Sequence, residues 1–195
     1  MTALPQPVVE TLGMGDMVPV LPLRLLSDLL DLEVTEDLRG RIADSTRFRV
    51  RICARLRAER GLADPVAVPS DPVVALLRDA DETTLNRVMA RAQALLRADL
   101  LRRGIGRADV LAHRQRFGPD YDAALAADLP EGLPLDGSVS AHEALAQALA
   151  DLPAEVAALL KLRFAPDVAA RLIAPPTRGY GAVIAIAMEA WHADA

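Results

Sequence analysis

Apolar residues recur at spacings of three and four along most of this chain, which is the pattern of helices with one buried face. The longest run, over about 82–103, carries one apolar stripe: Leu85, Val88, Met89, Ala92, Leu95, Leu96 and Leu100. Four arginines are expected on the outside of that helix: Arg87, Arg91, Arg97 and Arg102. Shorter helices are expected at 23–32, 107–116, 120–128 and 180–191.

Capping residues mark where several of these helices begin. Thr35 precedes Glu36 and Asp37, and acidic residues in a first turn favour the positive end of the helix dipole. Ser140 and Glu143 have the spacing of a capping box. Pro153 and Pro166 each start a further short helix.

The segment 36–60 fits two patterns. Arg47 to Ile52 alternates polar and apolar residues, which is typical of a strand. Phe48, Ile52 and Leu56 also recur every four residues, and Gly61 follows as a helix terminator. We favour the helix, because a strand would need a partner and no other segment alternates as clearly.

Prolines and glycines divide the remainder. Residues 1–22 hold four prolines and predict an extended arm, and residues 61–70 predict a linker or turn. The fold class expected is therefore all-α: a compact multi-helix domain over 23–195, with a possible sub-boundary at 61–70, behind a Pro-rich N-terminal arm.

Composition supports helices and excludes disorder. Of 195 residues, 52% are hydrophobic but only 3% aromatic, and most of the apolar residues are Leu, Ala and Val. The net charge of −5 argues against general nucleic-acid affinity. Its distribution is uneven: residues 1–38 carry −6 (seven acids, one arginine), and residues 39–60 carry +6 (eight arginines, two acids).

Candidate chemistry is sparse. Cys53 is the single cysteine, which excludes an intramolecular disulfide and suits a buried thiol in a reducing compartment. The three histidines have no ligand spacing, and the carboxylate pairs Asp79/Asp81 and Asp120/Asp122 lie at helix starts. We therefore assign no catalytic, cofactor-binding or metal-binding residue and expect no enzyme.

The sequence has no signal-peptide pattern and no apolar run near either end long enough to span a bilayer, so we expect a cytoplasmic protein.

The Arg-rich stretch 47–60 is the sharpest feature. The candidate partner-binding residues are Arg47, Arg49, Arg51, Arg55 and Arg57. Three interpretations stay open: a solvated helix face, a docking site for an acidic protein surface (the chain's own arm included), and a phosphate-binding helix.

From about residue 73 onward, the order of helices resembles a known family. The segments that carry the likeness are Val73–Arg78, Leu85–Arg103, Gly106–Leu111, Arg116–Tyr121, Ala144–Pro153 and Leu160–Pro166. They resemble the SctK (YscK-like) accessory proteins of bacterial type III secretion systems over roughly half the chain.

This resemblance implies a non-catalytic adaptor of the cytosolic sorting platform. Its partners would be inner-membrane ring and platform subunits, which would hold it at the cytoplasmic face of the inner membrane.

The competing class is a helical DNA-associated regulator, because Ala144 to Phe164 also resembles the helices of a sigma-factor-like reader. Asp167 and the pair Pro175-Pro176 follow where such a reader needs a basic recognition helix. An enzyme with dispersed residues is the third class.

Overall fold

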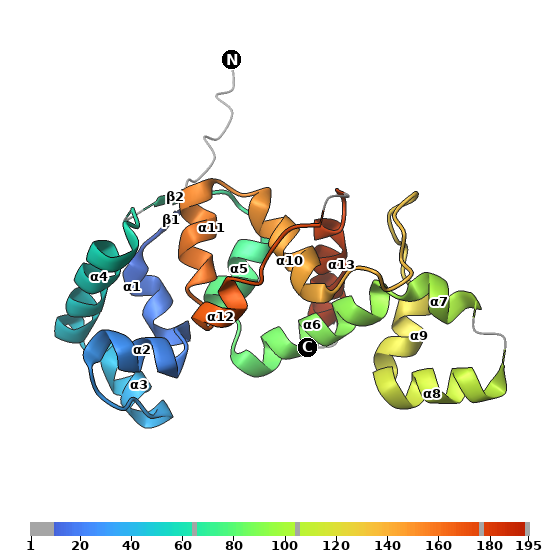
Figure 1. Ribbon diagram of the computed structural model, residues 1–195, viewed down its shortest axis with the longest axis horizontal. Helices are drawn as coiled ribbons and strands as arrows, with labels where there is room; N and C mark the ends of the chain where they lie inside the picture. Colours follow the sequence, from blue (N-terminus) through green and yellow to red (C-terminus); the bar gives the residue numbers. More distant parts are fainter. Residues whose placement is uncertain (1–9, 64–65, 104–105, 176–177, 194–195) are drawn as a thin grey trace, which may run out of the picture. The chain divides into compact units, whose positions relative to one another are not determined.

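A computed structural model describes residues 10–63, 66–103, 106–175 and 178–193 of the chain. Thirteen α-helices and one pair of short strands form this described part (Figure 1), which confirms the all-α class. The structure forms two compact units, residues 1–78 with 152–169 and residues 79–151 with 170–195. The predicted sub-boundary at 61–70 therefore lies inside the first unit, and the observed division follows Arg78.

The described residues of the first unit form ten elements. They are β1 (Glu10–Leu12), α1 (Met14–Met17), the 3₁₀ helix η1 (Val18–Val20), α2 (Leu23–Leu30), α3 (Glu36–Asp44), α4 (Thr46–Arg60), β2 (Val66–Val68), α5 (Pro72–Asp79), α11 (Ala154–Lys161) and α12 (Pro166–Ala169).

The predicted arm is wrong from Glu10 onward, and its first nine residues lie outside the described part. Leu12, Met14 and Met17 are fully buried, so this segment belongs to the core of the first unit. The prolines permit this packing because Pro19 lies in the first turn of η1 and Pro22 lies at the N-cap of α2, where no helical N–H is needed.

The predicted linker 61–70 is also wrong in part, because it contains a strand. β2 pairs antiparallel with β1, with Leu12 opposite Val66 and Glu10 opposite Val68. Val66 and Val68 are buried and Ala67 is exposed, as the alternation of a strand requires. Three residues are too few for this alternation to stand out between turn residues.

Six helices make up the part of the second unit that the structure describes. They are α6 (Glu82–Leu95), α7 (Ala98–Arg103), α8 (Arg107–Phe117), α9 (Pro119–Ala126), α10 (Ala141–Ala150) and α13 (Gly181–Ala193). α6, α10 and α13 pack against one another. At Gly181 the backbones of α13 and α10 come close: a Cβ there would lie 3.2 Å from the Cα of Ala148, so only glycine fits without a shift.

The long helix predicted over 82–103 is broken at Leu96 and Arg97. The loop around Gly137 inserts into its ladder of hydrogen bonds: the Gly137 N–H donates to the Leu96 carbonyl at 2.9 Å, and the Asp99 N–H donates to the Leu135 carbonyl at 3.0 Å. Two predicted positions change as a result. Leu100 is 42% exposed and has left the stripe, whereas Arg97 is half-buried beneath Gly137.

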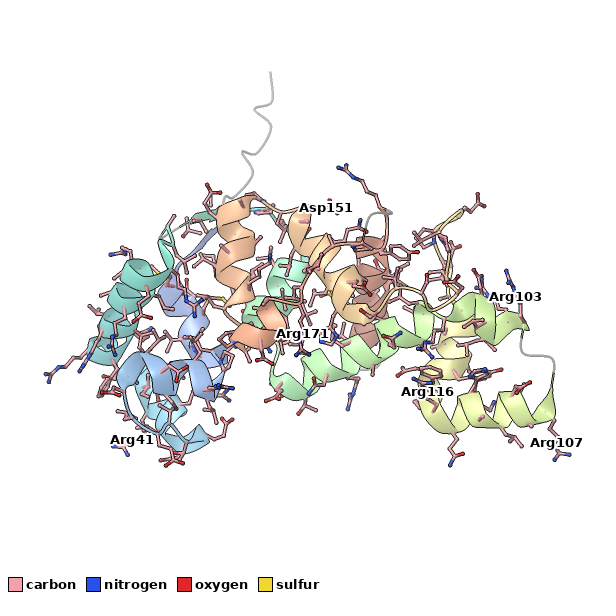
Figure 2. The ribbon with its side chains drawn as sticks, viewed as in Figure 1. Arg41, Arg103, Arg107, Arg116, Asp151 and Arg171 are labelled. Atoms are coloured by element: carbon pink, nitrogen blue, oxygen red, sulfur yellow. The ribbon has the colours of Figure 1, made fainter. Side chains whose placement is uncertain are left out.

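Helix α8 is attached more lightly than its neighbours. None of its residues is buried, and its inner side meets α9 through His113, whose ring stacks on those of Phe117 and Tyr121. Arginines project from α7 and α8, where Arg103, Arg107 and Arg116 are exposed (Figure 2). In the described part of the chain, no helix has the length and apolar character needed to cross a bilayer.

We expect Leu96→Asp to prevent folding of the second unit. Leu96 is 1% exposed, and burial of an unpaired carboxylate costs several kcal/mol, comparable to the whole stability of a domain. Leu100→Asp is the matched control and should change the unfolding free energy by less than about 0.5 kcal/mol. Thermal melts of both variants test the assignment, which fails if Leu96→Asp melts like the native chain.

The capping box predicts acid sensitivity. Glu143 accepts hydrogen bonds from the Ser140 N–H at 2.8 Å and from its hydroxyl at 2.7 Å, and these bonds lower the pKa of Glu143 below its usual 4.5. A lowered pKa means that the stabilisation is complete above about pH 4.5 and is lost as the pH falls further.

Glu143→Gln keeps an acceptor but does not titrate. Because this carboxylate is partly solvated, the native chain should lose at most about 1 kcal/mol more than the variant between pH 6 and pH 3. Urea unfolding at both pH values measures the difference, and parallel pH profiles would contradict the prediction.

Candidate protein-interaction surface on helix α4

Helix α4 is fixed in place by two buried side chains. Ile52 and Leu56 have no exposed area and face the contacts that α4 makes with α1, α2 and α3. The segment 47–52 is therefore helical, and the alternative of a strand is wrong. Ser45 separates α4 from α3, and Gly61 ends α4 with a φ of 62°, a value that favours glycine.

The helical conformation sorts the five predicted arginines into two rows. Residues four apart lie on the same side of a helix. Arg47, Arg51 and Arg55 therefore form one row, which we call the flank row, and Arg49 and Arg57 lie on the other side with Cys53 between them, which we call the groove row. The two rows lie on either side of the buried pair Ile52 and Leu56.

The groove row borders a hollow of about 360 Å³, the α1–α4 groove. Its lining residues are Gly15, Asp16, Thr46, Arg49, Val50, Cys53, Ala54 and Arg57. Val50 is 64% exposed. The predicted buried thiol of Cys53 is half-buried and lines this groove. A Cβ on Gly15 would lie 4.0 Å from its sulfur, so α1 approaches α4 closely here.

The flank row lies on the α2 side of α4. The Arg55 guanidinium donates to the carbonyl of Leu29, one of the last carbonyls of α2, which have no partner within their own helix. Arg55 also lies 3.8 Å from Glu59 in an ion pair. Arg55 is thus part of the packing of α2 on α4, which separates it from the other predicted partner-binding residues.

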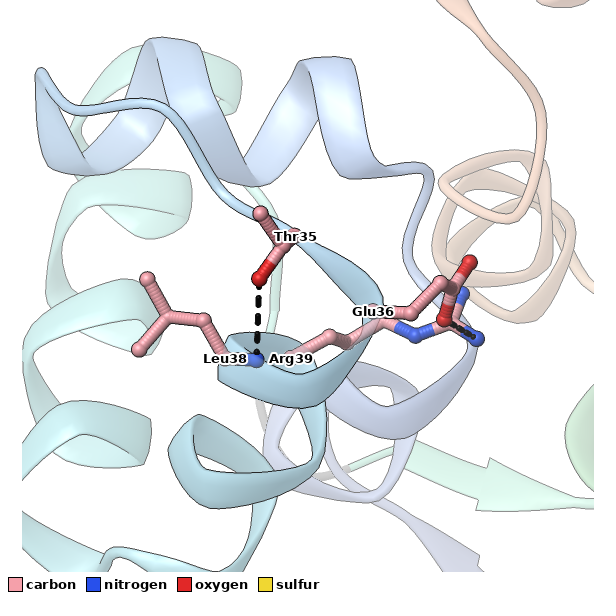
Figure 3. Close-up of polar contacts among 4 residues, drawn as sticks. All are labelled: Thr35, Glu36, Leu38 and Arg39. Carbon is pink, nitrogen blue, oxygen red and sulfur yellow. Dashed lines mark hydrogen bonds and ion pairs between the residues drawn. The ribbon is translucent and has the colours of Figure 1, made fainter.

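Arg47, Arg49 and Arg51 of α4 contrast with Arg39 of α3. Thr35 caps α3 as predicted, with its hydroxyl oxygen accepting from the Leu38 N–H at 3.3 Å, and Arg39 pairs with Glu36 at 2.6 Å (Figure 3). In the described chain, the guanidinium groups of Arg47, Arg49 and Arg51 take part in no ion pair or hydrogen bond.

Exposed acidic side chains lie on the neighbouring segment. Asp28, Asp31, Glu33 and Asp37 are exposed, and none of their carboxylates forms an ion pair with another described residue. The charges of these four acids are therefore not matched by an ion pair within the described part of the first unit.

The other candidate chemistry is structural where it is described. Asp81 caps α6 by accepting from the Thr84 N–H at 2.7 Å, and Asp122 pairs with Arg114 at 3.1 Å. His142 is exposed, and the side chain of His192 lies outside the described part. Among the described residues no three His, Cys, Asp or Glu side chains gather closely enough to hold a metal ion.

Sequence reasoning found the arginines but missed the groove. One wall of the groove is Gly15 and Asp16 of α1, and α1 lies in the segment predicted to be an arm. Val50 gave no signal in the sequence, because single apolar residues are common on protein surfaces and its 64% exposure is known only from the fold.

Comparison with known proteins adds no relative: no family model, no curated protein and no solved structure matches this chain.

Arg55→Ala should destabilise the first unit by about 1–2 kcal/mol, because the variant leaves the Leu29 carbonyl without its charged donor. Arg51→Ala removes the same side chain four residues earlier in the same row and should cost less than about 0.5 kcal/mol. Chemical unfolding of both variants makes the comparison. Equal losses would show that the contact between Arg55 and Leu29 contributes nothing.

Proposed function

We propose that this chain is a non-catalytic adaptor and that an acidic partner protein docks in the α1–α4 groove. The observation that carries the proposal is the guanidinium group of Arg49, which has no ion pair or hydrogen bond in the described chain, beside the exposed Val50. Val50 beside Arg49 on the α4 wall, with Asp16 on the α1 wall, suits a helix that has an apolar anchor and acidic residues on the side that meets Arg49.

The dimensions of the groove support a docking anchor. About 360 Å³ accommodates a few side chains, whereas a specific interface buries about 800 Å² on each partner. The groove would therefore form the centre of a larger contact, and arginine is enriched at such centres. Stability alone does not require these charges, because exposed ion pairs contribute about 0–1 kcal/mol each.

The resemblance to SctK proteins supplies the larger setting of this proposal. In that setting the partners are inner-membrane ring and platform subunits of a type III secretion system, and the chain works at the cytoplasmic face of the inner membrane. Co-purification of the tagged full chain from its native host, with identification of what is bound, tests the setting. Recovery of ring or platform proteins supports it, recovery of DNA supports the regulator, and recovery of neither contradicts both.

A pair of matched variants tests the groove. Arg49→Glu with Val50→Glu changes the groove side of α4, and Arg47→Glu with Arg51→Glu changes the flank row of the same helix. The groove variant should keep the native melting temperature and lose at least about tenfold in affinity for the recovered partner, more at low salt. The flank variant should bind that partner as the native chain does.

Two results would contradict the docking proposal. The groove is not the docking site if the groove variant binds the partner as tightly as the native chain does. The same conclusion follows if the groove and flank variants lose equal affinity for the partner. Submicromolar binding of duplex DNA at physiological salt would instead favour the regulator over the adaptor, against the net charge of −5.

A further inference from the structure

A second surface of the first unit carries both signs of charge. It combines the exposed acids Asp28, Asp31 and Glu33 of the α2–α3 segment with Arg47 and Arg51 of the flank row, and we call it the mixed-charge surface. The hydrogen bond from Arg55 to Leu29 places the flank row beside the end of α2, and α2, α3 and α4 contact one another.

The acidic part of this surface is held rigidly. Asp31 ends α2 with a φ of 56°, the Leu32 N–H donates to the Ser27 carbonyl at 3.2 Å, and the Val34 N–H donates to the Ser27 hydroxyl at 3.0 Å. Val34 is buried while Leu32 is 42% exposed. The turn thus presents Leu32 between Asp31 and Glu33 in one conformation, which lowers the entropy cost of an ordered contact.

An apolar residue accompanies the basic part as well. Phe48 is 39% exposed and lies three residues before Arg51, on the same side of α4. In the described chain, neither Arg47 nor Arg51 forms an ion pair with the acids of this surface. The surface therefore combines exposed apolar side chains with charges of both signs that the fold leaves unpaired.

The arrangement of charge selects the occupant. A uniformly acidic partner would meet Asp31 and Glu33, and a uniformly basic partner would meet Arg47 and Arg51, so each would be repelled by half of the surface. A copy of the same surface, turned by a two-fold axis, places acids on arginines at both ends. In such an isologous contact every favourable pair forms twice.

We infer that two copies of this chain associate through the mixed-charge surface as a two-fold dimer. Arg47 and Arg51 of each copy face the acids of the α2–α3 segment of the other, around Leu32 and Phe48. The dimer does not depend on the proposed adaptor function, because it uses the flank row and leaves the groove row open.

Sedimentation equilibrium of the full chain tests this inference. At low salt the mass should approach twice the 20.9 kDa of one chain, and about 0.5 M salt should weaken the association at least about tenfold. A monomer at 200 µM chain and low salt would overturn the inference.

Charge swaps identify the surface. Arg47→Glu with Arg51→Glu makes it wholly acidic, and Asp28→Lys with Glu33→Lys makes it basic at most positions. Asp31 is left unchanged because its positive φ suits aspartate better than lysine. Each variant alone should be monomeric, and an equimolar mixture should form a heterodimer, because acids then face cations at both ends.

The groove variant Arg49→Glu with Val50→Glu is the control and should dimerise like the native chain. The inference is overturned if either swapped variant forms a homodimer. It is also overturned if the mixture stays monomeric while both variants keep native melting temperatures. If a swapped variant fails to fold, the single substitutions Arg51→Glu and Glu33→Lys repeat the comparison. Failure of partner capture at the groove leaves these masses unchanged, so the two proposals fail separately.

Discussion

The burial of Ile52 and Leu56 is the constraint on which the surface of the first unit depends. These two side chains fix the rotation of α4 about its axis, and every other residue of the helix takes its direction from them. The alternation of arginine with apolar residues over 47–52 suits a strand, in which all three arginines would share one face. In the helix the same residues lie on two sides, so one basic stretch becomes a groove row and a flank row.

Local signals predicted what local interactions decide. Thr35, Asp81 and Ser140 each cap a helix through a hydrogen bond to an N–H three residues later, a distance visible in the sequence. The pairing of β1 with β2 and the break at Leu96 depend on residues that are 36 to 58 positions apart. The periodicity near Leu96 does not predict that the Gly137 N–H donates to the Leu96 carbonyl.

The candidate surface shows the same limit. Its arginines were found because charge is a property of single residues, but the groove needs α1, whose few residues lie among prolines and glycines that favour an extended chain. Burial of Leu12, Met14 and Met17 outweighs that local preference. The sequence alone could not distinguish Arg55 from the other arginines, because only the fold brings its guanidinium to the carbonyl of Leu29.

Two groups of arginines in the first unit differ in whether their guanidinium groups bond to backbone carbonyls. Arg163 is buried and donates to the Leu77 carbonyl at 3.2 Å, and Arg55 completes the end of α2. These side chains replace water at backbone carbonyls, and their loss would leave acceptors unsatisfied. Arg47, Arg49 and Arg51 make no such contact in the described chain, and their mutual repulsion makes folding slightly less favourable. Because these three arginines form no ion pair within the described chain, a surface of opposite charge on another molecule is a contact in which their charges become favourable.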